Sequence, residues 1–135
     1  MTLGPAGPAT ALAPVLAAVR AIGWRAVVLD LDGVGDKAAF MDRCARVLDL
    51  PDYFGRNWDA LADCLTDLSW AAPARGRLLV VTGWQGYADA APRDWDIAQE
   101  VFADAVAHWR GGETELQVLL ALGQGPSPSG AAETE

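Results

Sequence analysis

Lysine and histidine are almost absent from this sequence, and cysteine is rare. The 135 residues include one lysine (Lys37), one histidine (His108) and two cysteines (Cys44 and Cys64). His108 has no cysteine or serine in a recognisable nucleophile motif to work with. The cysteines have no Cys-x-x-Cys or metal-ligand spacing and cannot form a disulfide scaffold. We expect two buried, reduced thiols; a single disulfide between them is the alternative.

Positive charge is also scarce. Ten lysines and arginines stand against 18 aspartates and glutamates, which gives a formal net charge of −8. A protein of this sign repels phosphates, so the balance disfavours binding to nucleic acid or to an anionic membrane. The same balance favours a basic protein partner.

Long hydrophobic runs are missing. No stretch approaches the ~20 apolar residues that a membrane helix needs. The N-terminus lacks the positive region of a secretory signal, and Pro5, Pro8 and Pro14 interrupt its apolar run. We therefore expect a cytoplasmic protein with no membrane segment, and one domain's worth of chain with a single core.

What the sequence does contain is an alternation of helix and strand patterns. Strands separated by helices imply crossover connections and therefore a parallel sheet, so we expect an α/β fold. Residues 1–9 are expected to be flexible, residues 10–122 to form the domain, and residues 123–135 to be a disordered tail. The expected helices cover residues 10–22, a segment from Asp36 to before Pro51, 58–68 and 94–109, and the expected strands cover 25–31, 77–83 and 115–122.

The end of the first expected strand carries a motif that resembles a catalytic one. Asp30 and Asp32 lie in an Asp-x-Asp-Gly sequence, which resembles the nucleophile motif of the haloacid dehalogenase-like phosphatases. In that interpretation Asp30 attacks phosphorus, Asp32 is the acid/base, Mg²⁺ neutralises the charge and Thr82 holds the phosphate. Such a site needs further carboxylates for the metal, and the end of the third strand offers none. It also needs a lysine to hold the phosphoryl group, and the one lysine of the chain, Lys37, lies close behind the motif. A turn at the strand end is the alternative interpretation.

Three aspartates are spaced four residues apart in the helix expected at 58–68. Asp59, Asp63 and Asp67 put like charges on one face, which costs about 0.2–0.5 kcal/mol per pair. The outer two lie about 12 Å apart along the axis, too far to share one metal ion. Nothing nearby gives the carboxylates the different environments that acid/base catalysis requires. The row instead suits a row of arginines and lysines on another molecule.

Aromatic side chains accompany this acidic row. Tyr53, Phe54 and Trp58 are of the type that dominates interface energies, and we expect them to act as anchors. Asn57 is a good N-cap for the helix. Asp59 falls in the first turn, where the helix dipole favours an acid.

The stretch "LPDYFGRNWDALADCL" resembles the central motif of the barstar family, intracellular inhibitors of guanyl-specific secreted ribonucleases. Weaker resemblance covers residues 26–121, and the helix at 10–22 is an addition to the family pattern. The resemblance implies a three-stranded parallel sheet packed with helices, no enzymatic activity, and no cofactor or metal. The matching residues are Leu50, Pro51, Tyr53, Phe54, Gly55, Asn57, Asp59, Ala60, Leu61, Asp63, Cys64 and Leu65.

The resemblance also implies a partner: a basic, secreted ribonuclease, bound by a protein that is a monomer when free. Asp63 would enter the phosphate site of the nuclease. Barstar itself has a tryptophan contact where this chain has Ala62, which leaves the identity of the partner open. The alternative is an acidic interaction module for a basic partner that is not a nuclease. With Asp67 at the rim of the acidic row, the expected partner-binding residues are Tyr53, Gly55, Asn57, Trp58, Asp59, Ala62, Asp63, Asp67 and Asp104.

Overall fold

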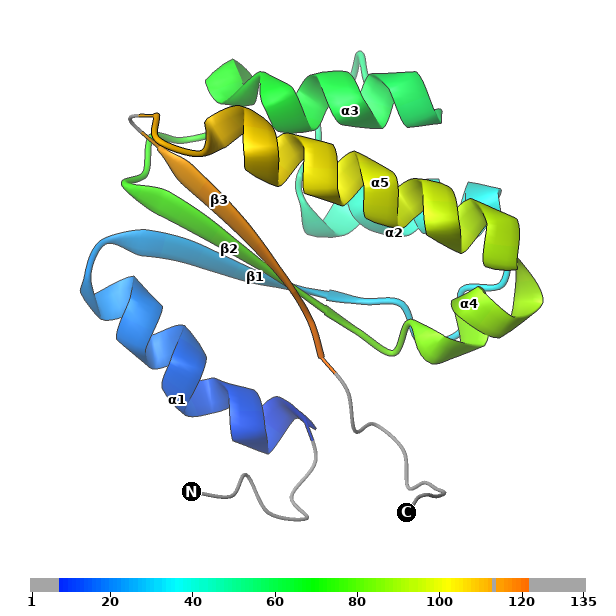
Figure 1. Ribbon diagram of the computed structural model, residues 1–135, viewed down its shortest axis with the longest axis horizontal. Helices are drawn as coiled ribbons and strands as arrows, with labels where there is room; N and C mark the ends of the chain where they lie inside the picture. Colours follow the sequence, from blue (N-terminus) through cyan, green and yellow to red (C-terminus); the bar gives the residue numbers. More distant parts are fainter. Residues whose placement is uncertain (1–7, 113, 122–135) are drawn as a thin grey trace.

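A computed structural model describes residues 8–112 and 114–121 of the chain (Figure 1). The expected tail at 123–135 and most of the expected flexible segment at 1–9 lie outside this range. The elements in chain order are α1 (Pro8–Ala21), β1 (Trp24–Asp30), α2 (Lys37–Val47), α3 (Trp58–Thr66), the 3₁₀ helix η1 (Leu68–Trp70), β2 (Gly76–Thr82), α4 (Gln85–Ala90), α5 (Pro92–Trp109) and β3 (Glu115–Leu120).

The three strands form one parallel sheet in the order β1-β2-β3. β1 pairs with β2 from Trp24 opposite Gly76 to Asp30 opposite Thr82, and β2 pairs with β3 from Gly76 opposite Glu115. Each crossover passes through helices, as parallel strands require. The predicted α/β architecture, with three parallel strands packed with helices, is confirmed.

The helices cover both faces of the sheet. In Figure 1, α2, α3 and α5 lie on one face, and α1 lies alone on the other. Alternate residues of β2 serve the two layers, because side chains on a strand alternate in direction. Leu79 and Val81 belong to the main core, whereas Leu78 and Val80 pack with Leu12 of α1. The main core is the larger of the two; in it α2 and α5 pack on the sheet, and α3 packs against α5.

The element boundaries lie close to those predicted, but the 3₁₀ helix η1 and the helix α4 were not predicted. α1 begins at Pro8, two residues earlier than expected, and α5 begins at Pro92, where a proline fits the first helical turn. α4 was not predicted, because Gln85–Ala90 is short and contains a glycine. Its one large apolar residue, Tyr87, is fully buried and stacks on Phe40.

None of the helices in the described part of the chain is long and apolar enough to cross a bilayer.

Candidate functional site

The segment between α2 and α3, residues 51–57, is a loop held by its own side chains. Asn57 is the N-cap of α3: its Oδ1 accepts a hydrogen bond from the Ala60 N–H at 2.8 Å. Its Nδ2 donates to the Gly55 carbonyl at 3.3 Å. A Cβ on Gly55 would lie 3.2 Å from that Nδ2. Gly55 therefore leaves room for the capping amide, and the predicted N-cap is confirmed.

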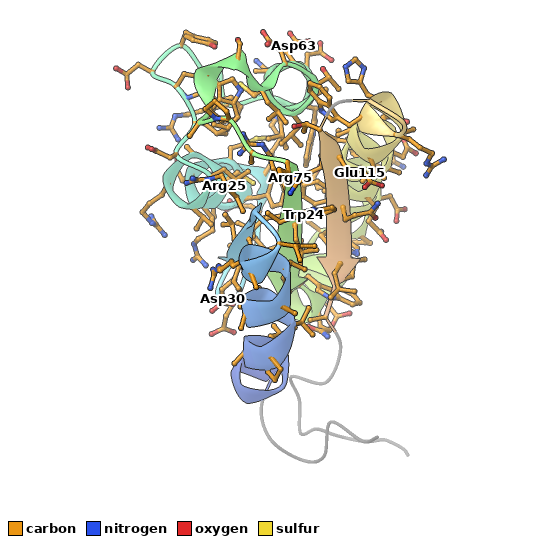
Figure 2. All side chains as sticks on the ribbon, turned by 90° about the vertical axis from the view of Figure 1, so that its left-hand side faces the viewer. Trp24, Arg25, Asp30, Asp63, Arg75 and Glu115 are labelled. Atoms are coloured by element: carbon orange, nitrogen blue, oxygen red, sulfur yellow. The ribbon has the colours of Figure 1, made fainter. Side chains whose placement is uncertain are left out.

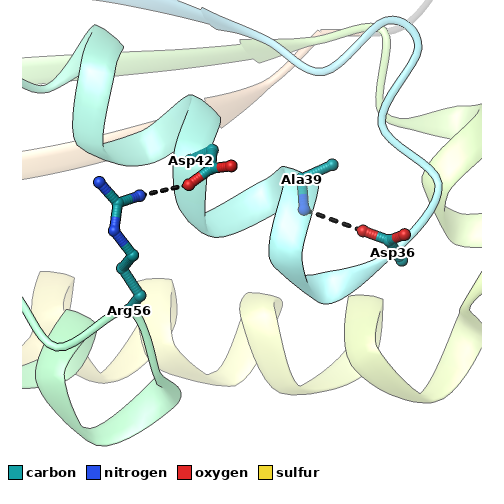
Figure 3. Close-up of polar contacts among 4 residues, drawn as sticks. All are labelled: Asp36, Ala39, Asp42 and Arg56. Atoms are coloured by element: carbon teal, nitrogen blue, oxygen red, sulfur yellow. Dashed lines mark hydrogen bonds and ion pairs between the residues drawn. The ribbon is translucent and has the colours of Figure 1, made fainter.

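Arg56 connects this loop to α2. Its guanidinium forms an ion pair with the Asp42 carboxylate, which Figure 3 shows beside the Asp36 cap of α2. The Asp36 carboxylate accepts a hydrogen bond from the Ala39 N–H at 2.9 Å and is the N-cap of α2. Arg56 has a φ of 57°, a left-handed conformation that is uncommon outside glycine. The sequence contains no local signal for the Arg56–Asp42 pair, because the partners are on different elements.

The aromatic residues near the loop divide between surface and core. Tyr53 is 72% exposed, whereas Phe54 is 7% exposed and belongs to the main core. Phe54 was expected to be an interface anchor. That expectation is wrong, because its ring packs in the core and attaches the loop to it. Trp58 is half-buried, and its ring centroid lies 5.5 Å from that of Phe40. Tyr53 is the aromatic side chain that the loop leaves fully available.

The helix α3 separates its acidic and apolar residues onto different faces. Asp59 and Asp63 are exposed one turn apart, while Leu61, Cys64 and Leu65 are buried. In Figure 2, Asp63 points away from the sheet into the surroundings. Ala62, beside Asp63 in the chain, is half-buried. The exposed side chains of residues 51–57 and of α3 together form what we call the acidic loop-helix surface.

Asp67 does not continue the acidic row as predicted. α3 ends at Thr66, and Asp67 has an extended backbone with φ −136° and ψ 93°. Its Oδ1 accepts from the Ser69 N–H at 3.2 Å and so caps η1. The Asp-x-Ser pattern was an available sequence signal for this local turn. The helical row therefore contains two aspartates, and Asp67 lies past its end in a capping role.

Asp104, the remaining predicted contact residue, is exposed on α5. α5 packs beside α3 in Figure 1, and the Trp109 Nε1–H of α5 donates to the Leu65 carbonyl of α3 at 2.7 Å. Phe102 and Ala105, on either side of Asp104, are buried in the main core. Asp104 is thus on a helix adjacent to the acidic loop-helix surface.

The Asp-x-Asp-Gly motif is a turn at the end of β1. The Asp30 Oδ1 accepts from the Asp32 N–H at 3.0 Å, and Gly33 has a φ of 84°. Arg43 of α2 donates to the backbone carbonyls of Asp30 and Asp32. Thr82, the expected phosphate holder, is 8% exposed. The Asp32–Asp30 hydrogen bond and the positive φ of Gly33 are those of a turn, as the alternative interpretation predicted. In the described segments, no group of three or more His, Cys, Asp or Glu side chains could hold a metal ion.

Both cysteines are free and buried, which confirms the expected reduced thiols. Burial raises the pKa of Cys44 to about 12. Burial also raises the pKa of Cys64, helped by the negative charges of Asp63 and Asp67. A thiol held protonated is a poor nucleophile and a poor metal ligand.

The fold and surface together define a small parallel α/β protein that exposes an acidic helix face beside a capped loop. The sequence pattern of a known family, described as Barstar (barnase inhibitor), matches residues 24–121. The chain belongs to the barstar family, which is a family of inhibitors and not of enzymes. The match starts at β1, so α1 precedes the matched range. No curated protein matches the chain in sequence.

Proposed function

We propose that this protein is a cytoplasmic inhibitor of a basic, guanyl-specific ribonuclease of the barnase type. It acts by placing the acidic loop-helix surface in the active site of the nuclease. The free protein is a monomer that binds its target one to one, and it uses no cofactor. The family assignment over residues 24–121 supports this kind of partner.

The observation that carries the proposal is the pair of exposed carboxylates on α3. Among the described residues, the one ion pair is Arg56–Asp42, so neither Asp59 nor Asp63 has a cationic partner within 4.0 Å. The opposite face of α3 is fixed in the core by Leu61 and Leu65. A ribonuclease must bind the phosphates of RNA with basic side chains. Two carboxylates on a rigid helix present negative charges, like those of phosphates, to these side chains.

Binding would also remove a cost that the free protein carries. Asp59 and Asp63 repel each other across one helical turn, by about 0.2–0.5 kcal/mol. A basic cleft that closes over the pair replaces this repulsion with attraction in a partly desolvated environment. In this arrangement Asp63 enters the phosphate site, Asp59 contacts its edge, and Tyr53 packs on the nuclease surface.

Ala62 marks the point where the partner can differ from other targets of the family. A half-buried alanine beside Asp63 offers little contact area, whereas barstar itself has a tryptophan contact at the matching position. A nuclease that fits this surface needs a bulkier side chain or a shallower hollow opposite Ala62. The alternative, a basic protein that is not a nuclease, requires the same two carboxylates but no phosphate site.

Complex formation with a purified barnase-type ribonuclease tests the proposal. Calorimetry should give one-to-one binding with an association that weakens as salt is added, because exposed charges are screened. Phosphate or a guanosine nucleotide should compete, since both occupy the nuclease active site. If neither phosphate nor nucleotide weakens the binding, the contact lies outside the nuclease active site. That result would favour the alternative, an acidic interaction module for a basic protein that is not a nuclease.

A further inference from the structure

A second polar feature lies at the end of the sheet where the strands begin. A cavity of about 260 Å³ opens there between the sheet, the end of α2 and η1. Most of its wall is apolar, including Val27, Val47, Leu65, Trp70 and Leu79. Two arginines, Arg25 and Arg77, also line this cavity, and we call it the arginine pocket.

The two arginines are direct neighbours on adjacent strands. Arg25 of β1 is in register with Arg77 of β2, so both side chains leave the same face of the sheet. Like charges placed opposite each other on paired strands destabilise a sheet. The acidic composition of the chain makes this pairing of two cations the more unusual.

The structure leaves this positive charge unneutralised. Within the described residues no carboxylate lies within 4.0 Å of either guanidinium, since the one ion pair found there is Arg56–Asp42. Arg77 donates to the Ala72 carbonyl, but its buried Nε–H has no acceptor. Burial and the charge of Arg25 lower the pKa of Arg77. Arg77 is half-buried and Arg25 is exposed, so water screens part of this charge, but the buried Nε–H of Arg77 still lacks a partner, which costs free energy.

Asp49 is the one acidic residue in the lining. It forms no ion pair with either arginine, and its negative charge would repel an anionic ligand. Its φ of 55° places it in a left-handed turn after α2. Figure 2 views the sheet from this end and shows Trp24, Arg25, Arg75 and Glu115 there, with Asp63 well apart on α3. The arginine pocket is therefore separate from the exposed carboxylates of the acidic loop-helix surface.

We propose that the arginine pocket binds a small organic anion, a monocarboxylate with an apolar body. The carboxylate lies between the Arg25 and Arg77 guanidinium groups, which hold such groups through charge-assisted hydrogen bonds. The apolar body lies against the walls formed by Val47, Leu65 and Trp70. The volume is near the lower limit of about 300 Å³ for small-molecule sites, so the ligand is small. This ligand site is additional to the proposed inhibition of a nuclease and does not depend on it.

Calorimetric titration of the full chain with phenylacetate, and with the uncharged phenylacetamide, tests this site. Phenylacetate should bind at millimolar concentration, and phenylacetamide should bind at least about tenfold more weakly, because it lacks the charge that the arginines recognise. Absence of phenylacetate binding, or equal binding of the two compounds, would overturn the proposal.

Four variants locate the binding. Arg25→Gln should weaken phenylacetate binding about tenfold, and it leaves the fold intact because Arg25 is exposed. Arg77→Gln should have a similar effect, with circular dichroism as the check on folding. Asp49→Asn should strengthen binding by removing a like charge, and Arg93→Gln, an exposed arginine outside the pocket, should leave it unchanged. Wild-type affinity in Arg25→Gln would contradict the assignment whatever happens at Arg77.

Discussion

The Arg56 guanidinium and the Asp42 carboxylate form an ion pair that ties the loop before α3 to the surface of α2. The pair joins residues 14 positions apart in sequence, and Arg56 has a left-handed backbone conformation. It directs the one basic residue of this loop away from Asp59 and Asp63. The acidic loop-helix surface consequently keeps its negative charge for a partner.

A double-mutant cycle measures this contact. Arg56→Ala, Asp42→Ala and the double variant should give a coupling of about 0.2–1 kcal/mol in the free energy of unfolding, the range for exposed pairs. The coupling should shrink with added salt. Urea denaturation at low and high salt provides the values, and zero coupling at low salt would mean that the pair is not formed in solution.

The cap of α3 is expected to determine part of the stability of the molecule. Asn57→Ala removes the acceptor of the Ala60 N–H and should lower the free energy of unfolding by about 1 kcal/mol. Asn57→Asp keeps a capping oxygen and should cost much less. Equal losses in the two variants, measured by urea denaturation, would argue against the cap as the cause.

Asp63 and Asp67 should differ in what they contribute to the free protein. Asp63→Ala removes a like-charge neighbour of Asp59, so it should leave stability unchanged or raise it by a few tenths of a kcal/mol. Asp67→Ala removes the cap on Ser69 and should lower stability by about 0.5–2 kcal/mol. Thermal unfolding of the two variants side by side checks this, and the reverse order would contradict the assignment of Asp67 as a cap.

Stability should fall in alkaline solution, partly because of Cys44. Burial raises the pKa of this thiol from 9.0 to about 12, so the folded protein retains a proton that the unfolded chain loses. The free energy of unfolding therefore falls as pH rises above 9.0 towards about 12. Cys44→Ala should show a smaller loss between about pH 8 and about pH 10 in urea denaturation. An unchanged pH profile in that variant would contradict the burial of the thiol.

Much of the fold was predictable because its signals are local. Short apolar runs identified the strands, and the alternation of strands and helices required a parallel sheet. Asp36 and Asn57 start helices by bonding to N–H groups three residues ahead, a contact that sequence spacing alone specifies. The exposed positions of Asp59 and Asp63 followed from the helical period once the apolar stripe was identified.

Two parts of the surface were misjudged, Phe54 because its burial depends on distant contacts and Asp67 because a local turn signal was overlooked. The Phe54 side chain packs into the main core, which lies beneath the loop at this position. The preceding residue, Tyr53, stays exposed. Asp67 is not part of the helical row, because the chain leaves the helix after Thr66 and forms a local turn that Asp67 caps. In each case a competing contact overrode a pattern that was correctly recognised.

The central claim, that Asp63 on α3 blocks a ribonuclease active site, is tested most directly by titrating nuclease activity. A barnase-type ribonuclease is assayed with increasing wild-type protein, Asp63→Ala, and the control Asp96→Ala, which alters an exposed aspartate on α5. Wild type and Asp96→Ala should inhibit stoichiometrically, while Asp63→Ala should weaken inhibition by at least about tenfold, the cost of losing a charged hydrogen-bond partner. Inhibition by Asp63→Ala as strong as that by wild type would contradict the claim.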